Sequence, residues 1–139
     1  MPVTHIHPVH VEFGDCDPAQ IVYFPNFFRW FDAATFHFFR ECGLPSWREL
    51  EGVHGLIGFP VVDVSCKFVR PATVGDHLEV HTTLEEWRDK SFVIRHELRR
   101  GGELVAEGRE IRVFAKRDPL DPARIKAVPA PESIRRMTG

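Results

Sequence analysis

The residues best placed to do chemistry stand in one turn near the N-terminus. Asp17 lies in the run Phe13-Gly14-Asp15-Cys16-Asp17-Pro18, a few residues before a long aromatic-rich segment with the pattern of a helix. A helix start offers unpaired N–H groups and a partial positive charge, so a carbonyl oxygen resting there would be polarised. A carboxylate beside that carbonyl could attack it or direct water onto it. This arrangement suits acyl transfer.

Simpler roles compete for the same residues. An Asp-Pro pair before a helix is common turn chemistry, in which Asp17 only caps the local backbone. Asp15 is a second carboxylate, and two acids this close could raise one pKa, but we expect a structural role for it. Cys16 could be a thiol nucleophile, yet the motif contains no histidine partner, so a buried inert thiol is expected.

Composition excludes several classes of protein. The chain has 139 residues, 43% hydrophobic and 27% charged, which predicts a single domain over 1–139 with its own core. A net charge of −2 gives no nucleic-acid footprint, and no apolar run is long enough for a membrane span. The N-terminus lacks the pattern of a secretory signal. Three widely spaced cysteines predict reduced thiols and a cytoplasmic location.

Three histidines near the N-terminus, His5, His7 and His10, raise the question of a metal site. Their near-alternation around Pro8 is typical of a strand, so no metal site is expected.

Apolar periodicity predicts the elements of the first half. Residues 5–13 alternate loosely and indicate a strand, and 24–42 indicate a helix of about five turns. One face of that helix would carry Phe24, Phe27, Phe28, Phe31, Thr35, Phe38 and Phe39. Pro25 suits the first helical position and Gly43 the position after the end. A short helix at 44–50 and a glycine-rich loop at 52–58 are expected next.

The second half changes to period two. Alternating segments near 62–68, 78–85, 92–98 and 105–113 predict four strands, each with one buried face. Residues 118–132 carry four prolines and predict an edge strand or extended tail. One long helix followed by an antiparallel meander is the α+β pattern, and the sheet must wrap the helix to cover its aromatic face.

Several motifs carry a resemblance that extends from about Val11 to Val128. The run Glu12–Asn26, together with Cys42-Gly43-Leu44-Pro45, Trp47-Arg48 and Glu110–Ala115, resembles the 4-hydroxybenzoyl-CoA thioesterase family. The resemblance implies the hotdog fold, an antiparallel sheet wrapped around one long central helix. It implies hydrolysis of an aryl-CoA thioester, foremost 4-hydroxybenzoyl-CoA, to free acid and CoA. It implies no cofactor beyond the coenzyme A of the substrate, and a homo-oligomer, a dimer at least and beyond that a tetramer, with sites at subunit interfaces.

The resemblance also assigns roles to single residues. Asp17 would be nucleophile or general base, and the backbone N–H groups at Tyr23 and Phe24 would bind the thioester oxygen. Asp32 would bind the hydroxyl of an aromatic acyl group, although a solvated helix position is the plain alternative.

Two aromatic residues bear on the acyl pocket. Trp47 would wall it, or else be an ordinary core residue. Phe59 would be a pocket residue where the family has a small hydroxyl residue, so its bulk leaves the identity of the acyl group undetermined.

A basic turn is the candidate for the nucleotide end of coenzyme A. Arg88, Lys90 and Ser91 could hold the phosphates, with Arg124 and Lys126 adding to the site. A charged hairpin turn is the ordinary alternative, and Asp89 departs from the more basic family pattern.

Three other functions stay open. A hotdog hydratase or dehydratase on acyl thioesters would need a histidine base, for which His37 and His54 are the reachable candidates. A thioesterase for short aliphatic acyl-CoA is the second, although Pro25 stands where such enzymes often carry histidine. A non-catalytic acyl-CoA-binding protein is the third.

Overall fold

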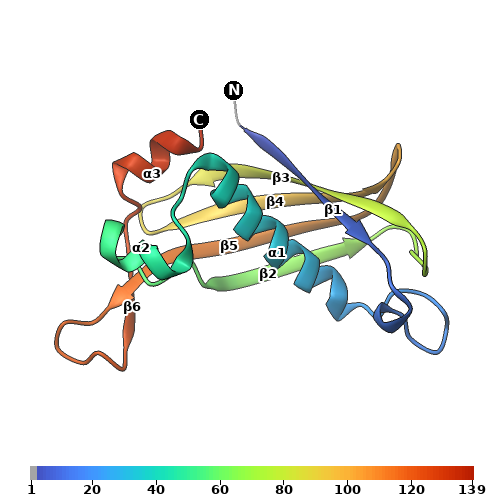
Figure 1. The fold of residues 1–139 in the computed structure, drawn as a ribbon, viewed down its shortest axis with the longest axis horizontal. Coiled ribbons are helices and arrows are strands. Elements are labelled where there is room, and N and C mark those ends of the chain that lie inside the picture. Colours follow the sequence, from blue (N-terminus) through green and yellow to red (C-terminus); the bar gives the residue numbers. More distant parts are fainter. Residues whose placement is uncertain (1–2) are drawn as a thin grey trace.

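The computed structural model describes residues 3–139, in which one antiparallel sheet curves around a long helix (Figure 1). The sheet has the strand order β1-β3-β4-β5-β2, and β6 pairs with the end of β5. The strands are β1 (Thr4–His10), β2 (Val61–Phe68), β3 (His77–Trp87), β4 (Ser91–Arg100), β5 (Glu103–Arg117) and β6 (Ile125–Val128). The helix α1 (Pro25–Cys42) crosses one face. The expected α+β class and hotdog arrangement are confirmed.

The bounds of α1 follow from its sequence. Pro25 takes the first helical position, and Gly43 ends the helix with φ of 109°. The buried side chains are Phe27, Trp30, Phe31, Ala34, Thr35, Phe38 and Phe39. The expected face was partly wrong, because Phe24 is 57% exposed and Phe28 is only half-buried. The stripe that faces the sheet advances by three and four residues from Phe27, which brings in Trp30 and Ala34 instead.

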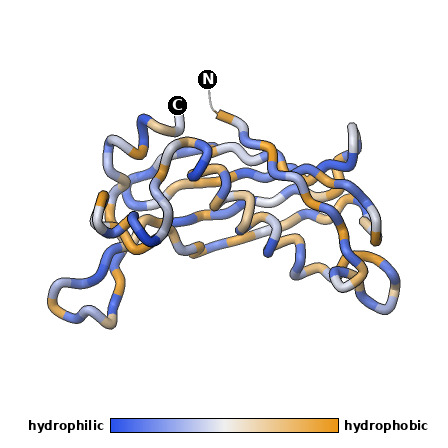
Figure 2. The backbone as a smooth tube through the Cα atoms, viewed as in Figure 1, coloured by the Kyte–Doolittle hydropathy of each residue, from blue (hydrophilic) through white to orange (hydrophobic). Residues whose placement is uncertain are grey.

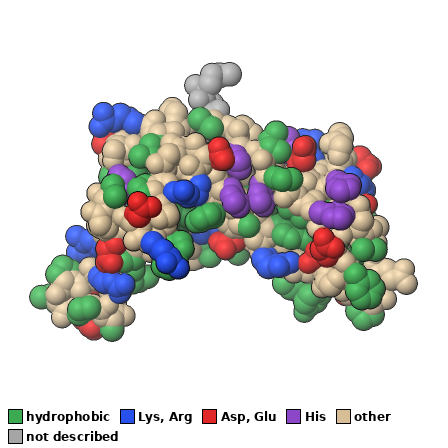
Figure 3. All heavy atoms as spheres, viewed as in Figure 1, with side chains coloured by type: hydrophobic (Ala, Val, Ile, Leu, Met, Phe, Trp, Pro, Cys, Tyr) green, Lys and Arg blue, Asp and Glu red, His purple; other side chains and the backbone are tan. Residues whose placement is uncertain are grey.

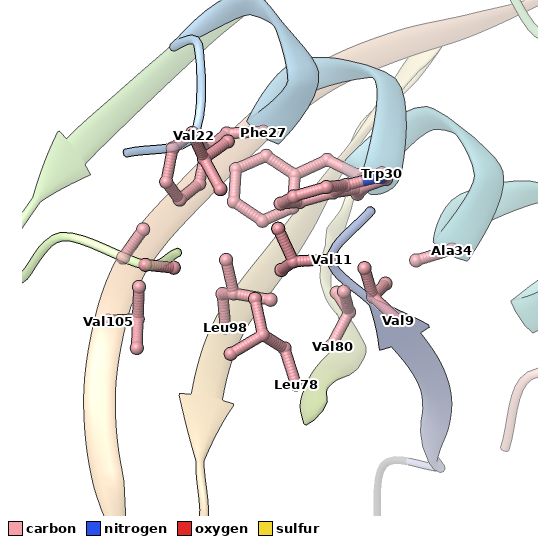
Figure 4. Packing of buried hydrophobic residues seen from close by; sticks show 13 residues of the cluster. Val9, Val11, Val22, Phe27, Trp30, Ala34, Leu78, Val80, Leu98 and Val105 are labelled. Atoms are coloured by element: carbon pink, nitrogen blue, oxygen red, sulfur yellow. The ribbon is translucent and has the colours of Figure 1, made fainter. Parts of the chain in front are cut away.

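Two apolar clusters lie between α1 and the sheet. Figure 4 shows the first, in which Phe27 and Trp30 of the helix rest over Val11, Leu98 and Val105. The second surrounds Phe38 and Phe39 and is closed by α2 (Trp47–His54) and α3 (Glu132–Met137). Figure 2 shows hydrophobic and hydrophilic residues alternating along the strands, as a sheet with one covered face requires.

Gly108 of β5 lies directly beneath a ring of α1. A Cβ atom at this position would collide with the ring of Phe31. That ring also stacks on His96, with centroids 4.8 Å apart and planes 2° apart. His96 is the residue that pairs with Gly108 across β4 and β5. A glycine therefore lets a helix ring rest directly on the strand backbone.

Several predicted bounds were wrong. Strand β1 ends at His10 rather than residue 13, because a short 3-10 turn at Phe13–Asp15 follows it. Helix α2 spans Trp47–His54 rather than 44–50, so Gly52, expected in a loop, is helical. The expected edge strand within 118–132 is confirmed as β6, whereas α3 was not predicted. No helix among residues 3–139 is long and apolar enough to cross a membrane.

The burial of two strands differs from the sequence pattern. Strand β2 is largely exposed apart from half-buried Cys66, because it is an edge strand of the sheet. At its end the ring of Phe68 still contacts the rings of Phe24, Phe27 and Phe28. On β5 the residues facing the core include Glu110 and Arg112, although the pattern favoured Ile111 and Val113. A register shift at the β4–β5 pairing accompanies this change of phase.

Candidate active site

Asp17 closes a tight turn and keeps one carboxylate oxygen unused. Its Oδ1 accepts a hydrogen bond from the Ala19 amide at 2.9 Å, and its own amide donates to the carbonyl of Ile21 at 2.9 Å. Gln20, within the turn, has φ of 67°. Oδ2 has no hydrogen-bond partner within residues 3–139. The turn role and a chemical role are therefore compatible, because they use different oxygens.

Asp15 is fully engaged by the chain itself. Its Oδ1 lies 2.8 Å from Nη2 of Arg29, and its Oδ2 accepts from the amide of Glu12 at 2.8 Å. Together Glu12 and Asp15 cap the short turn that precedes Asp17. This geometry agrees with the structural role expected for Asp15.

The start of α1 offers one backbone donor. The Tyr23 amide is taken, because it donates to the carbonyl of Asp15 at 2.8 Å. The Phe24 amide has no acceptor in the described part of the chain, and Pro25 has no N–H. An open apolar pocket of about 460 Å³ lies beside Phe24, lined also by Phe27 and Phe68. Of the two amides expected to bind an oxyanion, only that of Phe24 is available here.

A second pocket lies between α1, α2 and β5. Because it contains residues that the resemblance predicts for an acyl site, we refer to it as the acyl pocket. Its volume is about 380 Å³, and its lining comprises Phe36, Phe39, Arg40, Leu44, Pro45, Trp47, Leu50, Ile57, Gly58, Phe59, Pro60, Arg112, Ala115 and Ile125. Trp47 is 65% exposed, so it is not a core residue. The ring of Phe59 packs on Phe39 and Phe114, with centroids 5.0 and 6.0 Å away. Both aromatic residues expected at an acyl site thus share one pocket.

A buried polar network contributes Arg112 to the wall of this pocket. The sequence did not predict this network. Arg112, 4% exposed, donates to Asp32 Oδ1 at 2.8 Å and from Nε and Nη2 to Glu110 at 3.0 Å each. Glu110 also accepts from Thr35, and its Oε1 lies 3.2 Å from His96 Nε2. The only available signal was a Glu-x-Arg pair at alternate positions of a strand.

Electrostatics in this network favour the charged forms. Burial alone would raise the pKa of Glu110, but hydrogen bonds from His96 and Arg112 outweigh it and lower the pKa to about 2. Burial alone would lower the pKa of Arg112, yet its bonds to Glu110 and Asp32 raise it. The pair is therefore ionised at neutral pH.

The basic turn expected to bind phosphates lies between β3 and β4. The Arg88 side chain donates to Glu86 at 2.7 Å, while Lys90 is exposed with no ion-pair partner among residues 3–139. Arg135 of α3 donates to the Arg88 carbonyl at 2.9 Å and braces the turn. Ser91 starts β4 and is half-buried.

Arg124 and Lys126, the other phosphate candidates, lie on and just before β6. Lys126 pairs with Lys116 of β5, three residues beyond the point where Ser91 pairs with Val113. Both groups of basic residues therefore lie at one end of the sheet, the end shared with α2 and α3 (Figure 1).

The candidate residues form two groups at opposite ends of α1. Asp17 and Phe24 lie at its N-terminus, whereas Trp47 follows its C-terminus. An α-helix of 18 residues is about 27 Å long. One copy of the chain does not bring the carboxylate and the acyl pocket together.

Several histidine side chains are visible on one face of the molecule (Figure 3), and no histidine lines either of the two pockets described above. His7 stacks on His37 with centroids 4.6 Å apart, and partial burial and the neighbouring His37 lower the pKa of His7. Neither His37 nor His54 lines the acyl pocket or the pocket beside Phe24. Within residues 3–139 no cluster of three or more His, Cys, Asp or Glu side chains could hold a metal.

Several proteins with a similar sequence or fold are thioesterases. Residues 11–137 match the family model of the thioesterase-like superfamily. The 4-hydroxybenzoyl-CoA thioesterase of Pseudomonas sp. (strain CBS-3) is 47% identical over 126 residues, covering 87% of each chain. Among solved structures, the D17N mutant of a 4-hydroxybenzoyl-CoA thioesterase complexed with 4-hydroxybenzoyl-CoA has a TM-score of 0.91 and 40% identity, covering 98% and 99%.

A gentisyl-coenzyme A thioesterase is also similar, with a TM-score of 0.80 and 34% identity over 96% of this chain and 98% of that one. Because the family model covers nearly the whole chain and a relative shares almost half of its residues, the chain belongs to the thioesterase-like superfamily.

Proposed function

We propose that residues 1–139 form a single acyl-CoA thioesterase domain that hydrolyses 4-hydroxybenzoyl-CoA to 4-hydroxybenzoate and CoA. The observation that carries the proposal is that, within residues 3–139, Oδ2 of Asp17 and, a few residues later, the amide of Phe24 have no hydrogen-bond partner. The relative with 47% identity is a 4-hydroxybenzoyl-CoA thioesterase. A similar structure is that of an Asp-to-Asn variant at position 17 that holds 4-hydroxybenzoyl-CoA.

In this proposal the thioester oxygen accepts a hydrogen bond from the Phe24 amide, which stabilises the negative charge that develops there. Asp17 then acts in one of two ways. As nucleophile it adds to the carbonyl carbon and expels the CoA thiolate, and water hydrolyses the resulting anhydride. As general base it takes a proton from the water that adds to the carbonyl, after which the CoA thiolate leaves.

The separation of the two groups along α1 supports a site shared by two copies. Strand β2 lies at one edge of the sheet and exposes four apolar side chains at 42–61% of their surface, namely Val61, Val62, Val64 and Phe68. An exposed apolar edge of this kind is a template for pairing with another chain. Figure 3 shows a concave margin on this side of the molecule, between the two projecting ends.

A two-fold dimer built on β2 would set the N-terminus of one α1 near the acyl pocket of the other copy. A tetramer of two such dimers is the further expectation from the family. The three unpaired cysteines suit the reducing cytoplasm as its location.

The acyl pocket fits a ring, although Phe59 already fills its inner wall. The remaining volume of about 380 Å³ falls within the range of small-molecule sites. The packing of Phe59 on Phe39 and Phe114 also gives a reason to keep a second candidate, a thioesterase for short aliphatic acyl-CoA.

Thiol release from a panel of CoA thioesters tests these candidates. We expect kcat/KM to be highest for 4-hydroxybenzoyl-CoA, ahead of benzoyl-CoA and acetyl-CoA. A clear lead for acetyl-CoA would overturn the aryl preference and leave the thioesterase reaction in place. A lead for acetyl-CoA that Phe59→Thr reverses would identify Phe59 as the cause. Absence of thiol release from every thioester would overturn the proposed reaction.

A further inference from the structure

Two charged side chains line the acyl pocket, and they differ in what surrounds them. Arg40 is exposed and donates to the Leu44 carbonyl at 2.8 Å. Arg112 is only 4% exposed and forms part of the wall beside Phe59, whose ring lies 5.7 Å from the guanidinium carbon. A buried cation in an otherwise apolar wall is costly unless its donors are satisfied.

The hydrogen bonds of Arg112 use four of the five N–H donors of its guanidinium. A guanidinium has five N–H groups. Nε and one Nη2 hydrogen go to Glu110, the second Nη2 hydrogen goes to Asp32, and one Nη1 hydrogen goes to the Phe59 carbonyl at 2.9 Å. The fifth, on Nη1, has no acceptor within the described chain. A buried donor without a partner favours a ligand that brings an acceptor.

Asp32 sets an acceptor beside this donor. It lies one turn before Phe36 and two turns before Arg40, so it continues the row of α1 residues that lines the pocket. Its side chain is 71% exposed, its Oδ1 accepts from Arg112, and its Oδ2 has no partner among residues 3–139. Asp32 is thus bonded to Arg112, which lines the pocket, and the two bonded side chains together hold one open acceptor and one open donor.

We propose that Arg112 is a specificity-determining residue that reads the distal substituent of the acyl ring, beside the hydroxyl-binding role that the family resemblance already assigns to Asp32. This inference rests on the proposed thioesterase function. A phenolic hydroxyl donates its proton to Asp32 and accepts the Nη1 hydrogen of Arg112, so it satisfies both groups. An aromatic amine donates to Asp32 but is a poor acceptor, and an unsubstituted ring does neither. Glu110 fixes the plane of the guanidinium and thereby the direction of the remaining donor.

The test compares kcat/KM for 4-hydroxybenzoyl-CoA, 4-aminobenzoyl-CoA and benzoyl-CoA, followed by thiol release. The wild-type enzyme is expected to favour the hydroxyl over the amine by at least about tenfold, since a site built for a hydrogen bond rejects the analogue that leaves a group unpaired. Arg112→Met should lower the hydroxybenzoyl value by about tenfold or more and change the other two by less than about threefold. Arg109→Met, an exposed arginine on the same strand, should change none of them.

Arg112→Met leaves the buried Glu110 without its cation and is prone to misfold. The double variant Glu110→Gln/Arg112→Met removes both charges and should show the same changes in kcat/KM for the three thioesters as Arg112→Met. An equal fall for all three thioesters in the folded variants would assign Arg112 a structural role and overturn the inference.

The kcat/KM values of the wild-type enzyme for the three thioesters are an independent test that needs no variant. Equal wild-type rates with the hydroxyl and the amine would overturn the inference while leaving the thioesterase function intact. Absence of hydrolysis of every aryl thioester would instead overturn the proposed function on which the inference rests.

Discussion

The Asp15 carboxylate lies 2.8 Å from the Arg29 guanidinium, whereas Asp17, two residues later, has no cationic partner in the described chain. The Asp15 carboxylate is therefore fixed by its ion pair, whereas the Asp17 carboxylate is available to react with substrate. We expect Asp17→Asn to lower turnover by at least ~10³, roughly 4 kcal/mol of barrier, because the substitution keeps shape but removes charge and nucleophilicity. Steady-state thiol release measures the fall, and binding of the CoA thioester should persist.

Asp15→Asn is the matched control for Asp17→Asn and should cost far less turnover. A larger loss from Asp15→Asn than from Asp17→Asn would move the chemical role to Asp15.

The Phe24 amide can be removed without changing the course of the backbone. Phe24 has φ of −55°, which is close to the value that proline imposes. We expect Phe24→Pro to lower kcat by about 10²–10³, the usual cost of losing one oxyanion donor. Phe24→Ala keeps the amide and should retain most of the activity, with circular dichroism confirming that both variants are folded. Equal activity of the two variants would exclude the amide from the mechanism.

The buried Glu110–Arg112 pair predicts how stability depends on pH. Because the pKa of Glu110 falls from 4.5 to about 2 on folding, the folded protein binds fewer protons than the unfolded chain across that range. The stability that ionisation of Glu110 adds through this shift, about 3 kcal/mol, is present above pH 4.5 and is lost as the pH falls toward 2. Urea unfolding at a series of pH values measures the loss.

The double variant Glu110→Gln/Arg112→Met should flatten the acid limb of that stability curve. Glu51→Gln/Arg117→Met, which removes an exposed ion pair, should leave the limb as in the wild type. A wild-type limb no steeper than that of the first double variant would contradict the lowered pKa.

The turn between β3 and β4 should act on the nucleotide end of the substrate. Replacing Arg88 or Lys90 by Ala is expected to raise KM about tenfold with little change in kcat, since each loses a charge-assisted contact remote from the bond broken. The effect should vanish with a pantetheine thioester, which lacks the nucleotide phosphates. Equal losses with both substrates would remove the turn from the CoA site. Arg109→Ala serves as the control for a change of net charge.

A site shared between two copies can be tested by mixing two defective variants. Asp17→Asn disables the carboxylate, and Trp47→Glu places a charge on the wall of the acyl pocket. If each site joins Asp17 of one copy to the pocket of the other, random exchange of subunits restores about a quarter of wild-type activity, because half of the dimers then hold one intact site. A site contained within one copy would regain nothing on mixing, and thiol release after refolding the mixture distinguishes the two.

The parts of the structure that follow local rules were predictable from the sequence. Pro25 and Gly43 mark the ends of α1, and period-two alternation locates β3 and β4. The burial of Glu110 and Arg112 was not predictable, because binary patterning assigns charged residues to the solvent face and their mutual neutralisation is visible only in three dimensions.

Tertiary contacts explain two further differences. The Tyr23 amide is consumed by Asp15, a bond between segments that the sequence does not pair. The exposure of β2 depends on the strand order, which places it at an edge although its alternation resembles that of the central strands.

The contact between the Phe31 ring and the backbone at Gly108 means that the side-chain sizes at these two positions set the local distance between α1 and the sheet. Asp32 follows Phe31 directly, and Arg112 lies four residues along β5 from Gly108. The positions of both hydrogen-bonded side chains therefore depend on this contact. A larger residue at 108 would lift α1 and widen the distance between them, whereas a smaller ring at 31 would let the helix settle inward. Substitutions at Phe31 or Gly108 are therefore expected to change substrate choice, although neither residue lines the acyl pocket.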